Sequence, residues 1–358
     1  MNAPIRVAIL GAGIGAEHLA AYLALPDRFT VRALVDLDTN RATAVVGDTG
    51  VCVLGDMAQV LADPTIDLID VCLPPHLHFS VTKAALEAGK HVICEKPLVR
   101  SLADADALIA VANATGKSVF PVFQYRYGPA TAQLRALMDA GLAGRAYVAS
   151  LETHWNRGPD YYQVAWRGTW AGEAGGAVLG HAIHNHDLLC HFLGPIASLS
   201  AYTTTRVNDI ETEDCAAILM VLQSGAVATS SITLGAADDT TRIRLTFEGF
   251  TAESGTAAYA PAQDIWTFTA RSPVLQSAIN DVLAGVRDVP AGFVGYLDAI
   301  ADALAGRPGR EITLADGRRS VELVTAVYAA ARSGERIALP LGPDTELYQS
   351  WLAPEPTE

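Results

Sequence analysis

Short apolar runs separated by segments of mixed polarity fill the first third of the chain. Such runs predict strands, whereas apolar residues that recur every three or four positions predict helices. The expected strands cover residues 5–10, 29–35, 67–73, 91–94 and 118–123. The expected helices run from 16 to 25, from 57 to 61, from 79 to 88 and from 102 to about 112. Strands that alternate with helices are typical of a parallel sheet with helical crossovers.

The pattern changes near residue 123. One helical stretch at 130–140 is followed by runs of alternating polarity, such as AYVASLE, CAAILMVL and AVATSSITL. Alternation of this kind predicts antiparallel strands and hairpins. A long helix is expected from about 316 to 331. We therefore predict an α/β protein with two domains, residues 1–122 and 123–358.

The composition and net charge of the chain limit the kinds of partner that it can bind. The chain has 358 residues and a formal net charge of −14, which disfavours nucleic acid and anionic membranes because both require a basic surface. The uncharged stretch 215–237 could be a membrane span, but Gln223-Ser224-Gly225 in its middle favours two strands around a turn. Five cysteines without a CxxC spacing predict reduced thiols and a cytoplasmic protein.

A glycine-rich turn follows the first predicted strand. Gly11-Ala12-Gly13-Ile14-Gly15-Ala16 fits G-x-G-x-x-G/A, a turn that binds the pyrophosphate of a dinucleotide between a strand and a helix. Asp36 ends the second strand, where a carboxylate accepts hydrogen bonds from the adenosine ribose and repels a 2′-phosphate. We therefore expect NAD, with NADP less favoured. The alternative for Asp36 is an exposed loop acid.

Residues with reactive or hydrogen-bonding side chains also follow the other predicted strands of the first domain. Ligands of an open parallel sheet bind beyond the carboxyl ends of its strands. Lys96 directly follows the strand 91–94, so we expect its ammonium where nicotinamide and substrate meet; a solvated surface lysine is the alternative. The further candidate cofactor contacts are Leu73, Pro74, His76, His78, Glu95, Lys96, Pro97 and Gln124.

Three further segments extend the pattern: CEKPL at 94–98, GGAVLGHAIHNHDLL at 175–189 and ARSGERIALPL at 331–341. Together with the glycine turn they resemble the Gfo/Idh/MocA family of nicotinamide-dependent sugar and cyclitol oxidoreductases. The resemblance implies an N-terminal Rossmann domain and a C-terminal α/β domain with a large open, mostly antiparallel sheet. It also implies a homo-oligomer, a dimer or tetramer, and catalytic roles for Lys96 and His184.

Two positions depart from the family pattern. Pro75 stands where the family's P-N-x-x-H element has asparagine. Gly180 stands where many relatives carry an aspartate, four residues before His184, and His181 lies next to it. These departures bear on the substrate contacts more than on the chemistry.

Oxidation of a secondary alcohol requires a base for the hydroxyl proton and a positive group for the developing alkoxide, while nicotinamide takes the hydride. Imidazole suits the first role and ammonium the second. The candidate substrate contacts are Lys96, Arg126, His154, Tyr162, Arg167, His181, His184 and Asp187. We expect residues 154–170 to form an irregular aromatic loop, which either binds a sugar or packs on the second domain.

The histidines of the segment 181–187 resemble a metal cluster, but we expect a polar pocket wall and no metal. Three functions fit the sequence. The first is a sugar or cyclitol dehydrogenase. The second is a glycoside-modifying enzyme that oxidises C3 transiently with bound NAD. The third is a non-catalytic sensor of NAD or sugar, which the presence of both Lys96 and His184 disfavours.

Overall fold

The computed structural model describes residues 3–352, which form two compact units. The first unit contains the described residues up to Phe123 together with Phe293–Val321. The second contains Gln124–Gly292 and the described residues from Glu322 onwards. The first change of unit falls after Phe123, whereas the boundary that we predicted lies between residues 122 and 123 and stays a prediction. The sequence did not indicate that 293–321 belongs to the first unit.

The first unit is built on a six-stranded parallel sheet with the order β3-β2-β1-β4-β5-β6. The order reverses between β1 and β4, and this switch point is where such sheets bind ligands. This arrangement confirms the predicted Rossmann domain. The strands are β1 (Ile5–Leu10), β2 (Phe29–Val35), β3 (Cys52–Leu54), β4 (Leu68–Val71), β5 (His91–Cys94) and β6 (Val119–Pro121).

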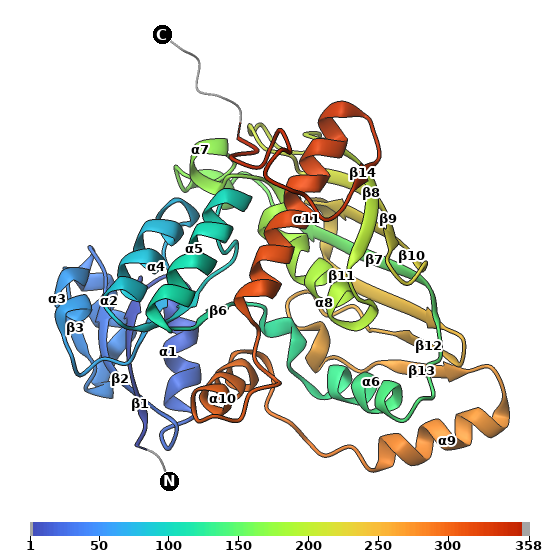
Figure 1. Ribbon diagram of the computed structural model, residues 1–358, viewed down its shortest axis with the longest axis horizontal. Helices are drawn as coiled ribbons and strands as arrows, with labels where there is room; N and C mark the ends of the chain where they lie inside the picture. The colour runs from blue at the N-terminus through green and yellow to red at the C-terminus, as the bar shows by residue number, and fades with distance from the viewer. Residues whose placement is uncertain (1–2, 353–358) are drawn as a thin grey trace. The chain divides into compact units, whose positions relative to one another are not determined.

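Helices of the first unit lie beside this sheet (Figure 1). Two of them begin at predicted caps, since Asp56 accepts the N–H of Ala58 at 2.8 Å and Ser101 that of Asp104 at 3.0 Å. The helices are α1 (Gly15–Leu23), α2 (Thr39–Val46), α3 (Met57–Ala62), α4 (His78–Glu87), α5 (Leu102–Thr115) and α10 (Gly292–Leu304). The prediction missed α2, which has few large apolar residues, and β3, which is only three residues long.

The returning segment is fixed to the first unit by polar contacts. Tyr296 of α10 donates a hydrogen bond to the carbonyl oxygen of Phe120 at 2.7 Å. Arg28 pairs with Asp298 and Asp302, each at 2.6 Å. Contacts of this kind join residues far apart in the chain, which explains why periodicity alone did not place the segment.

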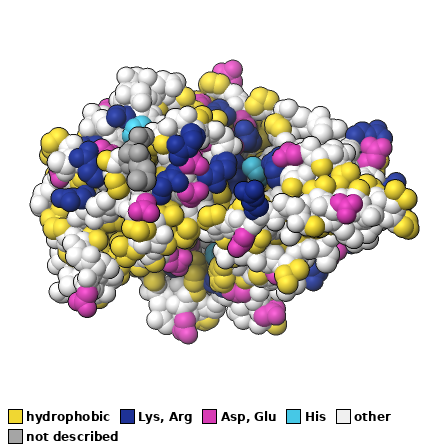
Figure 2. All heavy atoms as spheres, turned by 90° about the horizontal axis from the view of Figure 1, so that it is seen from below, with side chains coloured by type: hydrophobic (Ala, Val, Ile, Leu, Met, Phe, Trp, Pro, Cys, Tyr) yellow, Lys and Arg dark blue, Asp and Glu magenta, His cyan; other side chains and the backbone are white. Residues whose placement is uncertain are grey.

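Figure 2 shows basic and acidic side chains interspersed on one face of the molecule.

The second unit is built on an eight-stranded sheet with the order β13-β12-β11-β7-β10-β9-β8-β14. Strands β7 and β10 run parallel and the other neighbours antiparallel, as expected for a mostly antiparallel sheet. The strands are β7 (Ala146–Asn156), β8 (Ile196–Thr204), β9 (Cys215–Leu222), β10 (Val227–Thr233), β11 (Gly235–Phe247), β12 (Phe250–Glu253), β13 (Thr267–Ala270) and β14 (Ile337–Ala338).

The stretch 215–237 forms β9, a turn, β10 and the start of β11, which confirms the interpretation as strands. Within residues 3–352, none of the helices combines the length and the apolar character that crossing a bilayer requires. The helices of the second unit are α6 (Pro129–Asp139), α7 (Trp170–Glu173), α8 (Ile183–Leu193) and α9 (Pro273–Ala284), and α11 (Leu314–Ser333) begins in the first unit and ends in the second.

One face of the second sheet is buried and carries α8. Along β10, residues 228, 230 and 232 are buried, whereas 227, 229 and 231 are exposed. Asn185 of α8 donates a hydrogen bond to Thr153 of β7 at 2.7 Å, and His186 lies 3.0 Å from Ser230 of β10. The helix that carries His184 is therefore fixed to the middle of the sheet.

Candidate active site

The glycine turn joins β1 to α1. Gly11 has a φ of 101°, and a Cβ atom there would lie 2.3 Å from the carbonyl oxygen of Cys72, so the turn requires glycine. A Cβ atom at Gly13 would meet no atom within 4 Å. The turn thus leaves open space in front of α1, which fits the pyrophosphate of NAD.

Asp36 closes the same site at the end of β2. Its carboxylate accepts the N–H of Ala12 at 2.7 Å, the N–H of Asp38 at 2.8 Å and the guanidinium of Arg41 at 2.7 Å. Burial alone would raise the pKa of Asp36, but these hydrogen bonds hold it below its ordinary value. The site therefore presents an ionised acid beside the glycine turn, as adenosine ribose requires. Arg41 was not singled out from the sequence.

Lys96 follows β5 in a turn held from two sides. Oε2 of buried Glu95 accepts the N–H of Lys96 at 3.0 Å, and Lys96 itself is half-buried. The ring nitrogens of His78 lie 2.7 Å from the carbonyl oxygen of Pro97 and 2.8 Å from that of Leu73. The ring of His78 is fully buried and joins the segments that follow β4 and β5, and its predicted contact with the cofactor stays a prediction.

The remaining predicted cofactor residues occupy ends of strands. Leu73 and Pro74 follow β4 and are half-buried, and His76 is exposed in the turn behind them. Gln124 begins the second unit directly after Phe123. The glycine turn, Asp36 and Lys96 all lie at the carboxyl edge of the parallel sheet, because they follow β1, β2 and β5.

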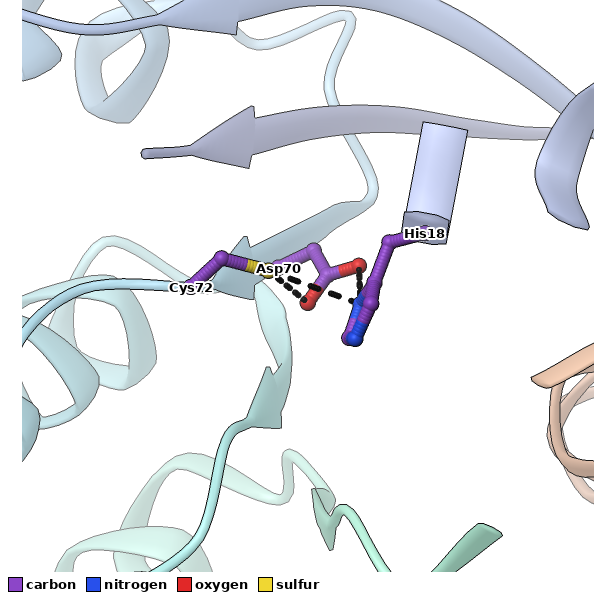
Figure 3. Close-up of side chains that lie close together, drawn as sticks. All are labelled: His18, Asp70 and Cys72. Carbon is purple, nitrogen blue, oxygen red and sulfur yellow. Dashed lines mark hydrogen bonds and ion pairs between the residues drawn. The ribbon is translucent and has the colours of Figure 1, made fainter. Parts of the chain in front are cut away.

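A buried polar cluster of the first unit was missed by the sequence analysis. His18 of α1, Asp70 of β4 and Cys72 point toward one another (Figure 3). His18 Nδ1 lies 2.8 Å from Asp70 Oδ2, and Nε2 lies 3.1 Å from Glu95 Oε1. The Cys72 sulfur lies 3.4 Å from Nδ1 and 3.5 Å from Asp70 Oδ1. We interpret these contacts as one hydrogen-bonded network.

In the second unit, α8 and the π-helical turn before it (Val178–Ala182) carry the predicted histidines. His184 stacks on Tyr125 with ring centroids 4.5 Å apart. His181 lies edge-on to Trp155 at 5.1 Å, and its Nε2 is 3.5 Å from the hydroxyl of Tyr161. Both imidazoles are buried among aromatic rings, which limits their rotation.

Arg126 and Asp187, both predicted as substrate contacts, pair with each other. The guanidinium donates to the two carboxylate oxygens at 2.7 and 2.6 Å, and the side chains are only 7% and 3% exposed. A buried bidentate pair is geometrically specific. It links the segment 124–126 to α8 and so positions His184, three residues before Asp187.

The predicted aromatic loop of residues 154–170 begins inside β7, which ends at Asn156, and the rest of it follows the strand. His154 lies on the opposite face of the strand from Trp155, and its Nε2 is 2.9 Å from the hydroxyl of exposed Ser231. His154 therefore lies apart from Trp155 and His181, and its contact with substrate stays a prediction. The guanidinium of Arg167 lies 3.9 Å from the ring centre of Tyr161, which contacts His181 and lies edge-on to Tyr162 at 5.0 Å.

Glu213, also missed from the sequence, anchors the chain before the π-helical turn. Its Oε1 accepts the N–H of Val178 at 3.0 Å and that of Gly176 at 3.1 Å, and the hydroxyl of Tyr328 donates to it at 3.1 Å. A Cβ atom at Gly176 would lie 1.8 Å from the carbonyl oxygen of Glu213, and one at Gly175 would lie 2.3 Å from the Tyr328 hydroxyl. The paired glycines are thus required by packing. Burial raises the pKa of Glu213 to about 7.

Gly180 has no such requirement, since a Cβ atom there would meet nothing within 4 Å. A Cβ atom is therefore tolerated at the position where the family pattern leads one to expect an aspartate. His186 points into the sheet, and burial lowers its pKa to about 4, which keeps its ring neutral near neutral pH.

Two family models match the chain. One, described as the oxidoreductase family with an NAD-binding Rossmann fold, matches residues 5–123. The other, described as the GFO/IDH/MocA C-terminal domain, matches residues 131–253. The chain belongs to the Gfo/Idh/MocA family of oxidoreductases. The resemblance, the fold and the NAD-binding character of the first domain are thereby confirmed.

Relatives of this Gfo/Idh/MocA protein include sugar dehydrogenases. The WlbA dehydrogenase from Bordetella pertussis, solved with NADH and UDP-GlcNAcA, is 27% identical with a TM-score of 0.83, and the match covers 95% of this chain and 100% of that chain. The D-glucoside 3-dehydrogenase from Escherichia coli is 30% identical over 58% of this chain and 60% of its own length. The levoglucosan dehydrogenase from Pseudarthrobacter phenanthrenivorans is 27% identical over 57% and 55%. The chain spans less than two thirds of the length of these two curated relatives.

Proposed function

We propose that this protein is an NAD-dependent dehydrogenase that oxidises a secondary hydroxyl group of a sugar, glycoside or cyclitol. The observation that carries the proposal is Lys96, a half-buried lysine at the carboxyl end of β5, in an NAD-binding domain whose switch point lies between β1 and β4. The substrates and ligands named for the relatives, a D-glucoside, levoglucosan and UDP-GlcNAcA, support the substrate class.

The residues of the chain divide the chemistry between them. Bound NAD supplies the hydride acceptor. Lys96 holds the reacting hydroxyl oxygen and stabilises negative charge as it develops there. His184 accepts the hydroxyl proton, with its ring orientation fixed by stacking on Tyr125. His181, Tyr162 and Arg167 contact the other hydroxyl groups of the substrate.

The test is NADH formation on a panel of sugars, sugar acids, inositols and glycosides. Lys96→Met and His184→Ala are each expected to lower kcat/KM by about 10³-fold or more, because each removes a group that acts in the transition state. The matched controls are Lys83→Met on α4, whose lysine pairs with Glu87 at the surface, and His191→Asn on α8. No turnover by the wild type on the whole panel, or full activity of Lys96→Met, contradicts the proposal.

The second candidate function uses the same residues for transient oxidation. The protein would oxidise C3 of a glycoside, a bond elsewhere would be eliminated, and the cofactor would be restored within one turnover. The relationship to a D-glucoside 3-dehydrogenase and the open space at Gly180 favour this candidate. Cleavage products without net NADH distinguish it from the first, whereas net NADH from a free sugar excludes it.

We also propose a homo-oligomer that forms through the exposed face of the second sheet. Val148, Leu219 and Val227 are 44%, 52% and 40% exposed on three neighbouring strands, and Val227 pairs directly with Val148. Burial of such a face in a partner copy removes apolar area from water. Light scattering is expected to report a dimer or tetramer that Leu219→Lys dissociates. A monomeric wild type contradicts the proposal. A cytoplasmic location stays a prediction.

A further inference from the structure

His18 connects the helix behind the glycine turn to the turn that carries Lys96. Its imidazole is fully buried, and Nε2 lies 3.1 Å from Glu95 Oε1. The other oxygen of Glu95 accepts the N–H of Lys96 at 3.0 Å. A continuous chain of hydrogen bonds therefore runs from α1 through the Glu95 carboxylate to the main chain of Lys96.

The proton count of this cluster follows from its geometry. Both ring nitrogens of His18 face carboxylate oxygens, of Asp70 and of Glu95. A neutral imidazole has a single N–H, so the two contacts together require a second proton. Burial alone would lower the pKa of His18, but the charge and hydrogen bond of Asp70 raise it well above its ordinary value. From this geometry and the raised pKa we infer an imidazolium held between two carboxylates.

Tyr22, Cys72 and Phe293 add neutral groups to this cluster. Tyr22 of α1 donates a hydrogen bond to Asp70 at 2.9 Å. Burial raises the pKa of the Cys72 thiol far above its ordinary value, so the sulfur carries no charge. Phe293 of the returning segment lies against the imidazole with ring centroids 4.4 Å apart. The charge of the ring is thus balanced by Asp70 in β4 and by Glu95, which follows the neighbouring strand β5.

We propose that His18 is a positioning residue: by holding the Glu95 carboxylate it fixes the main chain of Lys96 and keeps the ammonium where the substrate hydroxyl binds. The inference rests on the proposed function, in which Lys96 contacts the substrate. Because His18 touches neither substrate nor the reacting atoms, its loss is expected to reduce kcat more than the binding of NAD or sugar.

The decisive variant is His18→Gln, which keeps one N–H donor but removes the charge. We expect kcat to fall roughly 10–100-fold, since a small displacement of a catalytic group is enough for such a loss. The KM values for NAD and sugar should change less than about threefold, and the pH profile of kcat should shift. Tyr22→Phe is the matched control: it removes a hydrogen bond from Asp70, and both kcat and the pH profile should stay unchanged.

A double-mutant cycle tests whether His18 acts through its partner. Glu95→Gln should reproduce the defect, and the double variant should be no worse than either single variant, because all three interrupt the same connection. Multiplicative losses overturn the inference. So does a folded His18→Gln protein with wild-type kcat and pH profile, and in that case the proposed function stands. Full activity of Lys96→Met removes the proposed function instead.

A measurement without turnover covers the case in which His18→Gln does not fold. Nitrogen NMR of the His18 imidazole is then compared between the wild type and Glu95→Gln. The resonance of Nε2 should move, because that nitrogen faces Glu95, while the resonance of Nδ1 keeps the character set by Asp70. An unchanged Nε2 resonance overturns the inference.

Discussion

Glu95, a buried acid beside Lys96, and Glu213, a buried acid of the second unit, are stabilised by different partners. Glu95 shares the imidazolium of His18 with Asp70, so each carboxylate faces a positive charge. A charged partner offsets the cost of taking an acid out of water and keeps it ionised. The support that Lys96 receives from this cluster is therefore expected to stay the same across neutral pH.

Glu213 of the second unit has neutral donors. The N–H groups of Gly176 and Val178 and the hydroxyl of Tyr328 bond to its carboxylate. Dipoles compensate burial less completely than a full charge does, and burial raises the pKa of Glu213 to about 7. The chain that leads into α8 is therefore held by a group that changes protonation near neutral pH, whereas the turn at Lys96 is held by a charged cluster.

The largest expected effect tests the charged cluster. Asp70→Asn should lower the free energy of unfolding by about 3–5 kcal/mol, because it leaves a buried imidazolium without one of its charged partners. Asp67→Asn is the control: Asp67 pairs with Arg6 across side chains that are 38% and 43% exposed, so its loss should cost less than about 1 kcal/mol. Urea unfolding of both variants measures the difference. Equal losses of unfolding free energy in the two variants would show that the buried cluster stabilises the fold no more than the exposed ion pair does.

The second largest expected effect is the pH dependence of the free energy of unfolding that Glu213 causes. Its folded pKa of about 7 exceeds the ordinary value of 4.5, so the folded state binds the proton more strongly than the unfolded state does. The stabilising contribution is complete below a pH of about 4.5 and is lost as the pH rises through about 7. Relative to Glu213→Gln, the wild type should lose about 3 kcal/mol over that window. Thermal unfolding at several pH values measures this, and parallel curves for the two proteins contradict the assignment.

The His18–Glu95 cluster and Glu213 also show which features could be predicted from the sequence. Strands, the glycine turn and the caps at Asp56 and Ser101 were predicted because each depends on neighbouring residues. Lys96 was placed because parallel strands end at one edge. His18 was missed because its partners lie 52 and 77 residues away, and Glu213 because it bonds a glycine 37 residues before it.

The position of His154 could not be foreseen for a related reason. Composition identified an aromatic and polar segment, but the side of β7 on which each residue lies follows from the pairing with β10 and β11. Trp155 is buried and contacts His181, while His154 faces Ser231 on the other side of the strand. A shift of one position along a strand reverses the face, so composition alone could not separate the two.

The smallest expected effect is the loss of one tyrosine hydroxyl from each of the two buried acids, Asp70 and Glu213. Tyr22 donates to Asp70 at 2.9 Å and Tyr328 to Glu213 at 3.1 Å, and both rings are buried. Tyr22→Phe should cost about 1.5–3 kcal/mol of unfolding free energy at both pH 5 and pH 8, because its acceptor Asp70 also contacts the His18 ring. Tyr328→Phe should cost about 1 kcal/mol near pH 5, where Glu213 is protonated, and more near pH 8, where it is ionised. Chemical unfolding at the two pH values checks this, and a loss at Tyr328 that does not change with pH would mean that Glu213 keeps one protonation state throughout.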